Sequence, residues 1–407
     1  MSNANTSAAA PGTPWQQDAS VIGLVGLAHA SSHFGHLILP LLFPVFIQEF
    51  GFSYSELGML MTVFFAVSGL GQASSGFLVD KVGARPLLFL SLAMFGAACL
   101  LASVAHSYAA LVGVAALAGA ANAPFHPIDF TILNQRVSSP RLGYAFSAHG
   151  LTGNLGWAAA PVFFAGLGAL WGWRQAYVAA ALMYALVLGL LVLKRSHLKT
   201  IVVARNPQTD TGHAMAFMKL PVVWWCFGFF FLSTMTLAVV QSFAVSILKA
   251  MHGVSFEAAT YTITAYMLAG AMGVFVGGFV AARSVQSDRV VAGAMAVGAV
   301  LLAVCGTGWL SATATMVVLA ATGFAVGIGG PSRDMMIKKA TPQGATGRVY
   351  GLVYSGLDTG FALSPLLFGA FMDRGWYSAT LLGAAALLLL SVGAALGVGR
   401  RTTRSVA

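Results

Sequence analysis

Long apolar runs follow one another along almost the whole chain, and short polar segments separate them. A helix needs about 20 apolar residues to cross a bilayer, where each backbone amide must find its partner within the helix. The chain has 58% hydrophobic and only 8% charged residues, so a soluble globule would leave much apolar surface in water. The sequence therefore predicts an all-α integral membrane protein with about twelve transmembrane helices. We place the spans at residues 20–48, 55–79, 86–106, 109–135, 142–169, 173–193, 221–248, 257–282, 289–308, 312–337, 348–371 and 377–399.

Basic residues gather in every second loop and in the C-terminal tail. The residues on this side are Lys81, Arg85, Arg136, Arg141, Lys194, Arg195, Lys199, Arg205, Lys219, Arg283, Arg289, Lys338, Lys339, Arg348, Arg400, Arg401 and Arg404. Only Arg174, Lys249 and Arg374 fall on the other side. By the positive-inside rule the basic side is cytoplasmic, which puts both termini in the cytoplasm. The sequence shows no basic groove with interleaved aromatic residues, so nucleic-acid binding is not indicated.

The N-terminal residues and the cysteines add two expectations. Residues 1–19 lack the basic start and cleavage pattern of a signal peptide, so we expect a flexible cytoplasmic tail and a first span that is retained. Cys99, Cys226 and Cys305 lie singly inside predicted spans, which indicates neither a disulfide framework nor a metal framework.

The two halves of the chain repeat each other at a separation of 204 residues. The matching pairs are Gly119 and Gly323, Pro127 and Pro331, Gly143 and Gly347, Asn154 and Asp358, Gly156 and Gly360, and Pro161 and Pro365. Matching glycines and prolines imply matching kinks and close helix contacts, so the halves should share one fold. We expect six-helix bundles at 20–193 and 221–399, a cytoplasmic linker at 194–220 and a basic tail at 400–407.

A charged, glycine-punctuated segment lies between the second and third predicted spans, from Gly76 to Arg85. It resembles the loop between the second and third helices of the major facilitator superfamily. The resemblance implies two bundles related by an axis along the membrane normal, with a substrate cavity between them at mid-membrane. The corresponding segment of the second half, Gly277 to Arg283, lacks the acid. We expect Asp80 and Arg85, with Asp334 of the second half, to take part in gating.

A narrower resemblance rests on the fourth and fifth predicted spans. The segments Gly119 to Pro127, Gly143 to Ser147 and Gly153 to Gly156 resemble the fosmidomycin-resistance branch of the superfamily, whose members export a phosphonate antibiotic from bacteria. The segment Gly156 to Pro161 also resembles the fifth-helix motif of drug and proton antiporters, with alanine where glycine is usual, which favours export. The tenth span departs from the drug-exporting member at Pro331 to Asp334, so the substrate stays open.

Charged groups inside the bilayer are costly, so they indicate functional sites. Asp129 follows His126 by one helical turn, beside a backbone loosened by Pro124 and Pro127. Our hypothesis is that the pair binds the coupling proton, because a poorly hydrated carboxyl group holds its proton more tightly and histidine titrates near neutral pH. The alternative is structural: His126 bonds the freed carbonyls and Asp129 pairs with Arg136 near the cytoplasmic surface.

Arg333 is the repeat partner of Asp129, so the two should face each other across the cavity. A guanidinium group can hold a carboxylate or phosphonate with two parallel hydrogen bonds, which makes Arg333 a candidate substrate anchor. The alternative is a gate between the bundles, in which Arg333 pairs with Asp129, Asp334 or Asp358.

Three histidines share one face of the first span, at His29, His33 and His36. First helices of each bundle line the cavity in the superfamily that the chain resembles. The histidines could bind substrate or a proton, with His33 as the proton candidate, or could simply pack. A metal is the remaining alternative, but one helix alone cannot wrap an ion, so we predict no metal site.

Other polar residues inside predicted spans are candidate substrate contacts or helix braces. They are His149 and Asn154 on the fifth span, Asp358 on the eleventh, and Gln72, Asn122 and Gln241, of which we select Gln241 as a substrate contact.

Enzyme functions are not indicated. The chain has no phosphate-binding Gly-Lys-Ser or Gly-Lys-Thr loop, no His-Glu-x-x-His pair and no nucleophile elbow. We therefore predict a monomeric, proton-coupled secondary transporter of the bacterial inner membrane, without a cofactor. The expected activity is export of a small anionic or amphipathic solute, and the alternative is proton-coupled uptake of an organic acid.

Overall fold

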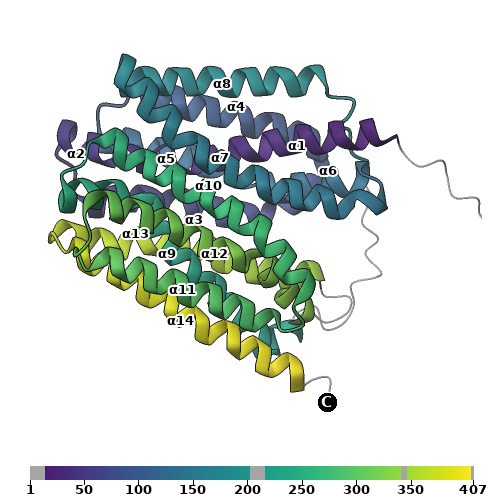
Figure 1. Cartoon of the computed structure of the whole chain (residues 1–407). Coiled ribbons are helices and arrows are strands. Elements are labelled where there is room, and N and C mark those ends of the chain that lie inside the picture. Colours follow the sequence, from purple (N-terminus) through teal and green to yellow (C-terminus); the bar gives the residue numbers. More distant parts are fainter. Residues whose placement is uncertain (1–13, 202–215, 341–345, 405–407) are drawn as a thin grey trace, which may run out of the picture.

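The structure is a computed structural model that describes residues 14–201, 216–340 and 346–404, apart from a few side chains in these ranges, and these residues form helices and no strand. The first half contains α1 (Trp15–His36), η1 (Pro40–Leu42), α2 (Phe43–Phe50), α3 (Tyr54–Val82), α4 (Ala84–Ser103), α5 (Tyr108–Asn122), α6 (Phe125–Arg136), η2 (Ser139–Arg141), α7 (Leu142–Trp171) and α8 (Trp173–Leu193). The second half contains η4 (Ala216–Lys219), α9 (Pro221–His252), α10 (Phe256–Arg283), α11 (Ser287–Gly306), α12 (Ala312–Ala340), α13 (Thr346–Asp373) and α14 (Tyr377–Arg404) (Figure 1).

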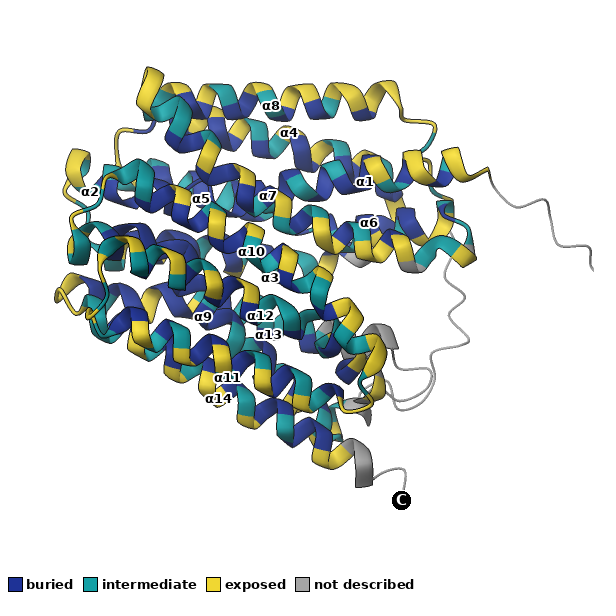
Figure 2. Ribbon diagram, in the orientation of Figure 1, coloured by how far each residue is buried: buried dark blue, intermediate teal, exposed yellow. Residues whose placement is uncertain are grey.

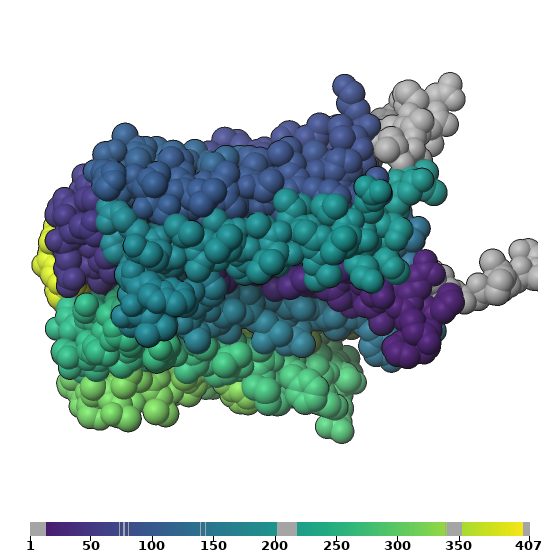
Figure 3. Space-filling view, turned by 90° about the horizontal axis from the view of Figure 1, so that it is seen from above, coloured from purple at the N-terminus to yellow at the C-terminus, as the bar shows by residue number. Residues whose placement is uncertain are grey.

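The helices form two bundles that lie side by side (Figures 1 and 3). In the first bundle α1 packs on α7, α4 on α8 and α3 on α5; in the second, α10 packs on α12, α11 on α14 and α9 on α13. Among the described residues, eleven helical segments are long and apolar enough to cross a membrane, and α13, which packs on both α3 and α9, completes the set of twelve long helical segments. This architecture confirms the predicted fold of two six-helix bundles.

The outward faces of the bundles are apolar. On α8, Leu182, Leu186 and Leu193 are 61%, 76% and 81% exposed, and Figure 2 shows exposed positions repeated along this helix. Water would penalise such a surface, whereas lipid tails solvate it. The exposed leucines therefore mark a lipid-facing surface.

Prolines divide two of the predicted spans. The first span breaks after His36, and the chain passes through η1, which begins at Pro40, into α2, which has Pro44 in its first turn. The fourth span breaks between α5 and α6 at Pro124. Proline has no backbone N–H to donate and restricts the residue before it, so a helix stops or bends there. The break at Pro124 matters for function because α6 carries His126 and Asp129.

The charged segment from Gly76 to Arg85 is mostly helical, which corrects the predicted loop. α3 continues to Val82, and the turn into α4 occurs at Gly83, whose φ of +90° favours glycine. Arg85 donates from Nη1 to the backbone oxygen of Arg195, 3.3 Å away. The side chain of Asp80 lies outside the described residues, so the gating roles of Asp80 and Arg85 stay predictions.

The first helix begins inside the expected N-terminal tail. α1 starts at Trp15, and Asp18 is buried against the connection between α6 and α7. Its carboxylate accepts hydrogen bonds from the hydroxyl of Ser138 at 2.5 Å and from Nη1 of Arg141 at 2.7 Å. These partners explain why the helix begins several residues before the apolar run.

The bundles are joined at the end of the molecule opposite the chain termini. Asp373, at the end of α13, accepts the backbone N–H of Tyr54 at 2.6 Å, that of Ser55 at 3.0 Å, and the Ser55 hydroxyl. Deeper along the same interface, the rings of Phe65 and Phe361 stack with centroids 4.4 Å apart. The bundles diverge toward the end where the termini lie (Figure 1). The structure is thus closed at the end opposite the termini.

Gly277 should be far less tolerant of a side chain than its neighbour Gly278 on the same helix. A Cβ atom at Gly277 would lie 2.3 Å from the backbone oxygen of Ile328 in α12, whereas a Cβ at Gly278 meets nothing within 4 Å. We expect Gly277→Ala to destabilise the protein by about 1–3 kcal/mol and Gly278→Ala to change stability by less than about 0.5 kcal/mol. Thermal unfolding of both variants in detergent measures the difference. Equal melting temperatures would contradict the close packing of α10 on α12.

Candidate functional site

Histidines from three helices of the first bundle meet at one place. α1 contributes His29, His33 and His36, which share a face because they lie four and three residues apart. α6 contributes His126, and α7 contributes His149. The ring of His29 lies 4.4 Å from that of His33, 5.6 Å from that of His126 and 3.5 Å from that of His149, measured between centroids. Five of the nine histidines of the chain thus form one histidine cluster, with these residues as its members.

Asp129 supplies the one carboxylate in contact with the histidine cluster among the described residues. The side chain of Asp129 is fully buried, and its Oδ2 atom accepts from Nε2 of His149 at 3.0 Å. The same oxygen lies 3.1 Å from Nδ1 of His29, without the alignment of a hydrogen bond. The second oxygen, Oδ1, is buried and has no hydrogen-bond partner. A carboxylate in this setting is costly when charged, because only two imidazole rings compensate it.

The hypothesis that paired Asp129 with His126 is therefore modified by the structure. Both residues lie on α6 near the same cluster, but the carboxylate of Asp129 contacts His149 and His29. The alternative of an arginine partner is not what the structure shows either, since the described contact of Arg136 is with the backbone oxygen of Ser196, at 3.5 Å.

Both ring nitrogens of His36 are hydrogen-bonded within the first bundle. Its Nδ1 atom accepts the indole N–H of Trp157 at 3.3 Å, so its Nε2 atom carries the proton and donates to Oδ1 of Asn122 at 3.0 Å. Asn122 in turn accepts from Ser32 and donates to Ser68. A neutral imidazole with both nitrogens bonded stabilises the packing of α1, α3, α5 and α7, and it has no free nitrogen to offer a ligand.

A chain of side chains leads from the histidine cluster to the second bundle. Nδ1 of His126 lies 3.2 Å from Oε1 of Gln72, on α3. Nε2 of Gln72 donates to Oδ2 of Asp358, on α13, at 3.4 Å. Because α3 and α13 belong to different bundles, this path joins the histidine cluster to the contact between the two bundles.

Two overlapping sets of side chains have the composition of a metal site. One consists of His29, His33 and His126, and the other of His29, Asp129 and His149; in each set the candidate ligand atoms lie within 4.8 Å of one another. Imidazole nitrogens suit transition metals, whereas Mg²⁺ and Ca²⁺ prefer oxygen ligands.

The second bundle places its predicted residues apart from the histidine cluster, except for Asp358. Nε of Arg333 donates to Oδ1 of Asp334 at 3.0 Å, and the guanidinium carbon lies 5.0 Å from the ring centroid of Phe230. The side chain of Arg333 is 35% exposed. Gln241, on α9, is buried and its Nε2 atom has no hydrogen-bond partner. The roles predicted for these residues stay predictions.

Asn154 bonds within its own helix, whereas the preceding residue, Gly153, lies against two histidines of the cluster. The side-chain amide of Asn154 donates to the backbone oxygen of Gly150, at 3.1 Å, within α7. Gly153 faces α1, since a Cβ atom there would lie 2.8 Å from Nδ1 of His33 and 3.0 Å from Nε2 of His29. Sequence reasoning gave Gly153 and Trp157 no role in the site. The signal was the regular spacing of four residues from His149 to Gly153 and from Gly153 to Trp157, which places all three on one face of α7.

The fold and the site define a class of protein. Two six-helix bundles with a buried polar site near their interface form a multi-pass membrane transporter. The family model described as "Major Facilitator Superfamily" matches residues 25–313 and 226–406. The chain therefore belongs to the major facilitator superfamily, and it is a transporter and not an enzyme, as the sequence predicted.

Two curated relatives and one solved structure are similar to this chain. The "Fosmidomycin resistance protein" of Escherichia coli (strain K12) is 24% identical over 281 residues, which are 67% of each chain. The "Probable L-galactonate transporter" of the same strain is 25% identical over 131 residues, 32% of this chain and 29% of that protein. A bacterial homologue of the human lysosomal transporter Spinster, solved in an inward-facing and unoccupied conformation, has a TM-score of 0.76 at 15% identity and covers 96% of this chain and 99% of that chain.

Proposed function

We propose that this transporter is driven by protons and that Asp129 carries the coupling proton. The supporting observation is the fully buried carboxylate between His149 and His29, with one oxygen that lacks a hydrogen-bond partner. Protonation removes the cost of a charge in this setting, and hydration of the site on opening restores the charged form. Uptake and release of a proton would therefore favour different conformations of the bundles.

The contact between the bundles supports coupling at this site. His126 of the histidine cluster bonds Gln72, and Gln72 bonds Asp358 of the second bundle. A change of charge at Asp129 alters the field at His126, which lies one helical turn away on α6. The path through Gln72 gives that change a direct mechanical consequence at the α3 and α13 interface.

We infer that the solute is a small anionic or amphipathic compound and that it moves outward. The name of the first relative, a fosmidomycin resistance protein, supports export of an anionic compound. Arg333 supports an anion, because its guanidinium group is partly exposed and is held between Phe230 and Asp334. Uptake of an organic acid is the second candidate; the relative named as a probable L-galactonate transporter favours it, and Arg333 suits it equally well.

The setting that we propose is the bacterial inner membrane, with both termini in the cytoplasm. The clustering of basic residues on the side of the termini supports this orientation. A monomer is sufficient for the activity, because each chain contains both bundles.

Survival of a drug-hypersensitive bacterium that makes this protein tests the proposed export. The challenge is fosmidomycin together with a small panel of anionic antibiotics, and the variants are Arg333→Lys and Arg333→Gln. We expect protection by the wild type, and at least about a tenfold lower protective effect for Arg333→Gln, because the glutamine removes a charge-assisted contact. Protection that is equal in all three proteins would contradict the anion-binding role of Arg333. Failure of a well-expressed wild type to protect would favour uptake of an organic acid.

A further inference from the structure

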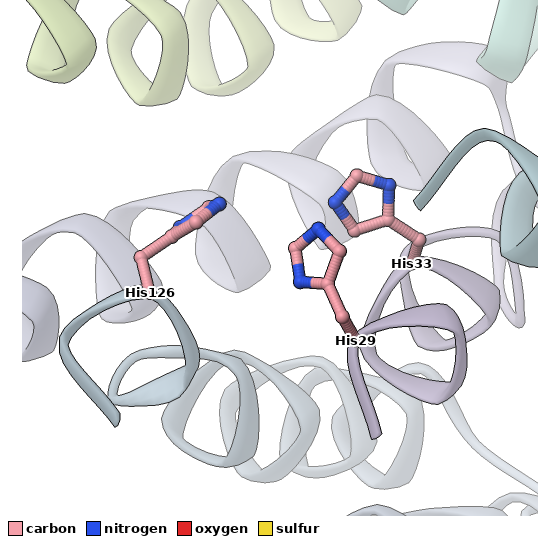
Figure 4. Close-up of side chains that lie close together, drawn as sticks. All are labelled: His29, His33 and His126. Carbon is pink, nitrogen blue, oxygen red and sulfur yellow. The ribbon is translucent and has the colours of Figure 1, made fainter. Parts of the chain in front are cut away.

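The ring nitrogens of three histidines converge on one space in the first bundle. Figure 4 shows His29 and His33 on α1 and His126 on α6, with their rings directed toward one another. One nitrogen from each ring lies within 4.8 Å of the others. The histidines come from two separate helices, so they surround the space in a way that one helix cannot.

The opposite edges of two of these rings lie against side-chain oxygen atoms. Nδ1 of His126 lies 3.2 Å from Oε1 of Gln72, and Nδ1 of His29 lies 3.1 Å from Oδ2 of Asp129. A histidine that binds a metal usually presents its other ring nitrogen to a carboxylate or an amide oxygen, which orients the ring. Gln72 and Asp129 occupy these positions, and the Nε2 atoms of His126 and His29 are left for a ligand.

His33 supplies an independent observation. Its Nδ1 atom is buried and has no hydrogen-bond partner. A buried ring nitrogen without a partner loses the hydrogen bond that it would make with water, at a cost of about 1–3 kcal/mol. The ring lies against the imidazoles of His29 and His36 and the indole of Trp157, and none of these gives Nδ1 a hydrogen-bond partner. A ligand held between the rings would account for it.

The two rings of α1 lie directly against the backbone of α7, because position 153 is a glycine and has no side chain. A Cβ atom at Gly153 would lie 2.6 Å from Cε1 of His33 and 3.0 Å from Nε2 of His29. Any side chain at position 153 would therefore push both rings out of place. The glycine keeps the two histidines close to each other and to α7.

We propose that His29, His33 and His126 bind a divalent transition-metal ion such as Zn²⁺ or Co²⁺, with Asp129 and Gln72 as the groups that orient the ligands. Three imidazoles and one open position form a familiar coordination set for these ions. Zn–N bonds of about 2.1 Å place the nitrogens roughly 3.4 Å apart, so the rings would close in by about 1 Å on binding. The proposal departs from the sequence prediction of no metal site, which considered the first helix alone. It depends neither on proton coupling nor on the identity of the solute.

Metal binding to the full-length protein in detergent tests the proposal directly. The protein is purified without a polyhistidine tag, treated with a chelator and titrated with Zn²⁺ in a calorimeter, and Co²⁺ is added separately to record its visible absorption. We expect one Zn²⁺ per chain and a Co²⁺ spectrum of low coordination number. His33→Gln and His126→Gln should each weaken Zn²⁺ binding by about tenfold or more. His106→Gln, which changes an exposed histidine outside the cluster, should leave it unchanged.

A glycine variant separates loss of the site from loss of the fold. Gly153→Val keeps every histidine but fills the space beside His33 and His29, so it should abolish the Co²⁺ spectrum in a protein that still elutes as a single species. Absence of Zn²⁺ binding to the wild type would overturn the proposal, as would binding that survives both histidine variants. These titrations need no proton gradient, so they fail or succeed independently of the proposed proton coupling.

Discussion

Asp129→Asn should abolish transport that is driven by a proton gradient and leave exchange of solute across the membrane in place. Asparagine has nearly the same volume as aspartate and can still bond His149, but it cannot take up or release a proton. Exchange of one solute molecule for another requires no net proton movement, so the alternating motion should continue. We expect a loss of roughly tenfold or more in the gradient-driven rate, which corresponds to at least about 1.4 kcal/mol.

Proteoliposomes measure both activities with the solute that the survival assay identifies. Uptake is recorded with and without an imposed proton gradient, and exchange is recorded with labelled solute on one side. Asp18→Asn is the matched control, because Asp18 is also a buried aspartate of the first bundle, but it pairs with Arg141 and Ser138. This control should retain its response to the gradient. A gradient response that persists in Asp129→Asn would refute the assignment of Asp129.

Asp373→Ala should open the end of the transporter opposite the termini. In the structure, the first turn of α3 has its N–H groups bonded by Ser53 of its own bundle and by Asp373 of the other bundle. Removal of the carboxylate leaves the N–H groups of Tyr54 and Ser55 to water and removes a negative charge from the positive end of the helix. We expect a shift of about 1–2 kcal/mol toward opening, because the contacts are charge-assisted but lie at the exposed surface.

Labelling of a single cysteine reports this shift. The three native cysteines are buried, and Thr62→Cys introduces a thiol where α3 meets α13, since the Thr62 hydroxyl bonds the backbone oxygen of Ala362. A membrane-impermeant maleimide should react roughly tenfold faster in the Asp373→Ala background. Glu257→Ala is the control, because it removes an acid from the same end of the second bundle, in the first turn of α10. Equal labelling rates of Thr62→Cys with and without Asp373→Ala would show that Asp373 does not hold this end closed.

The predictable part of the fold follows from the nature of the bilayer. Every span must satisfy its own backbone hydrogen bonds, so long apolar runs alone give the number and order of the helices. The spacing of glycines and prolines at 204 residues indicates the two similar bundles. The exact helix ends were harder to predict from the sequence, because they depend on particular contacts. α1 extends back to Trp15 through the partners of Asp18, and α3 extends to Val82 because the turn requires only Gly83.

The functional site was predictable only in its parts. The sequence alone identified the polar residues that a membrane helix would otherwise exclude, among them His29, His33, His126, Asp129 and His149, because their desolvation cost makes them conspicuous. Tertiary structure decided which of them touch. The break at Pro124 and the close approach of α7 to α1, where a Cβ at Gly156 would lie 2.1 Å from the backbone oxygen of Ala30, bring the carboxylate to His149 and three imidazoles to one space. Helical spacing determines contacts along one helix, whereas contacts between helices depend on backbone packing that no local pattern contains.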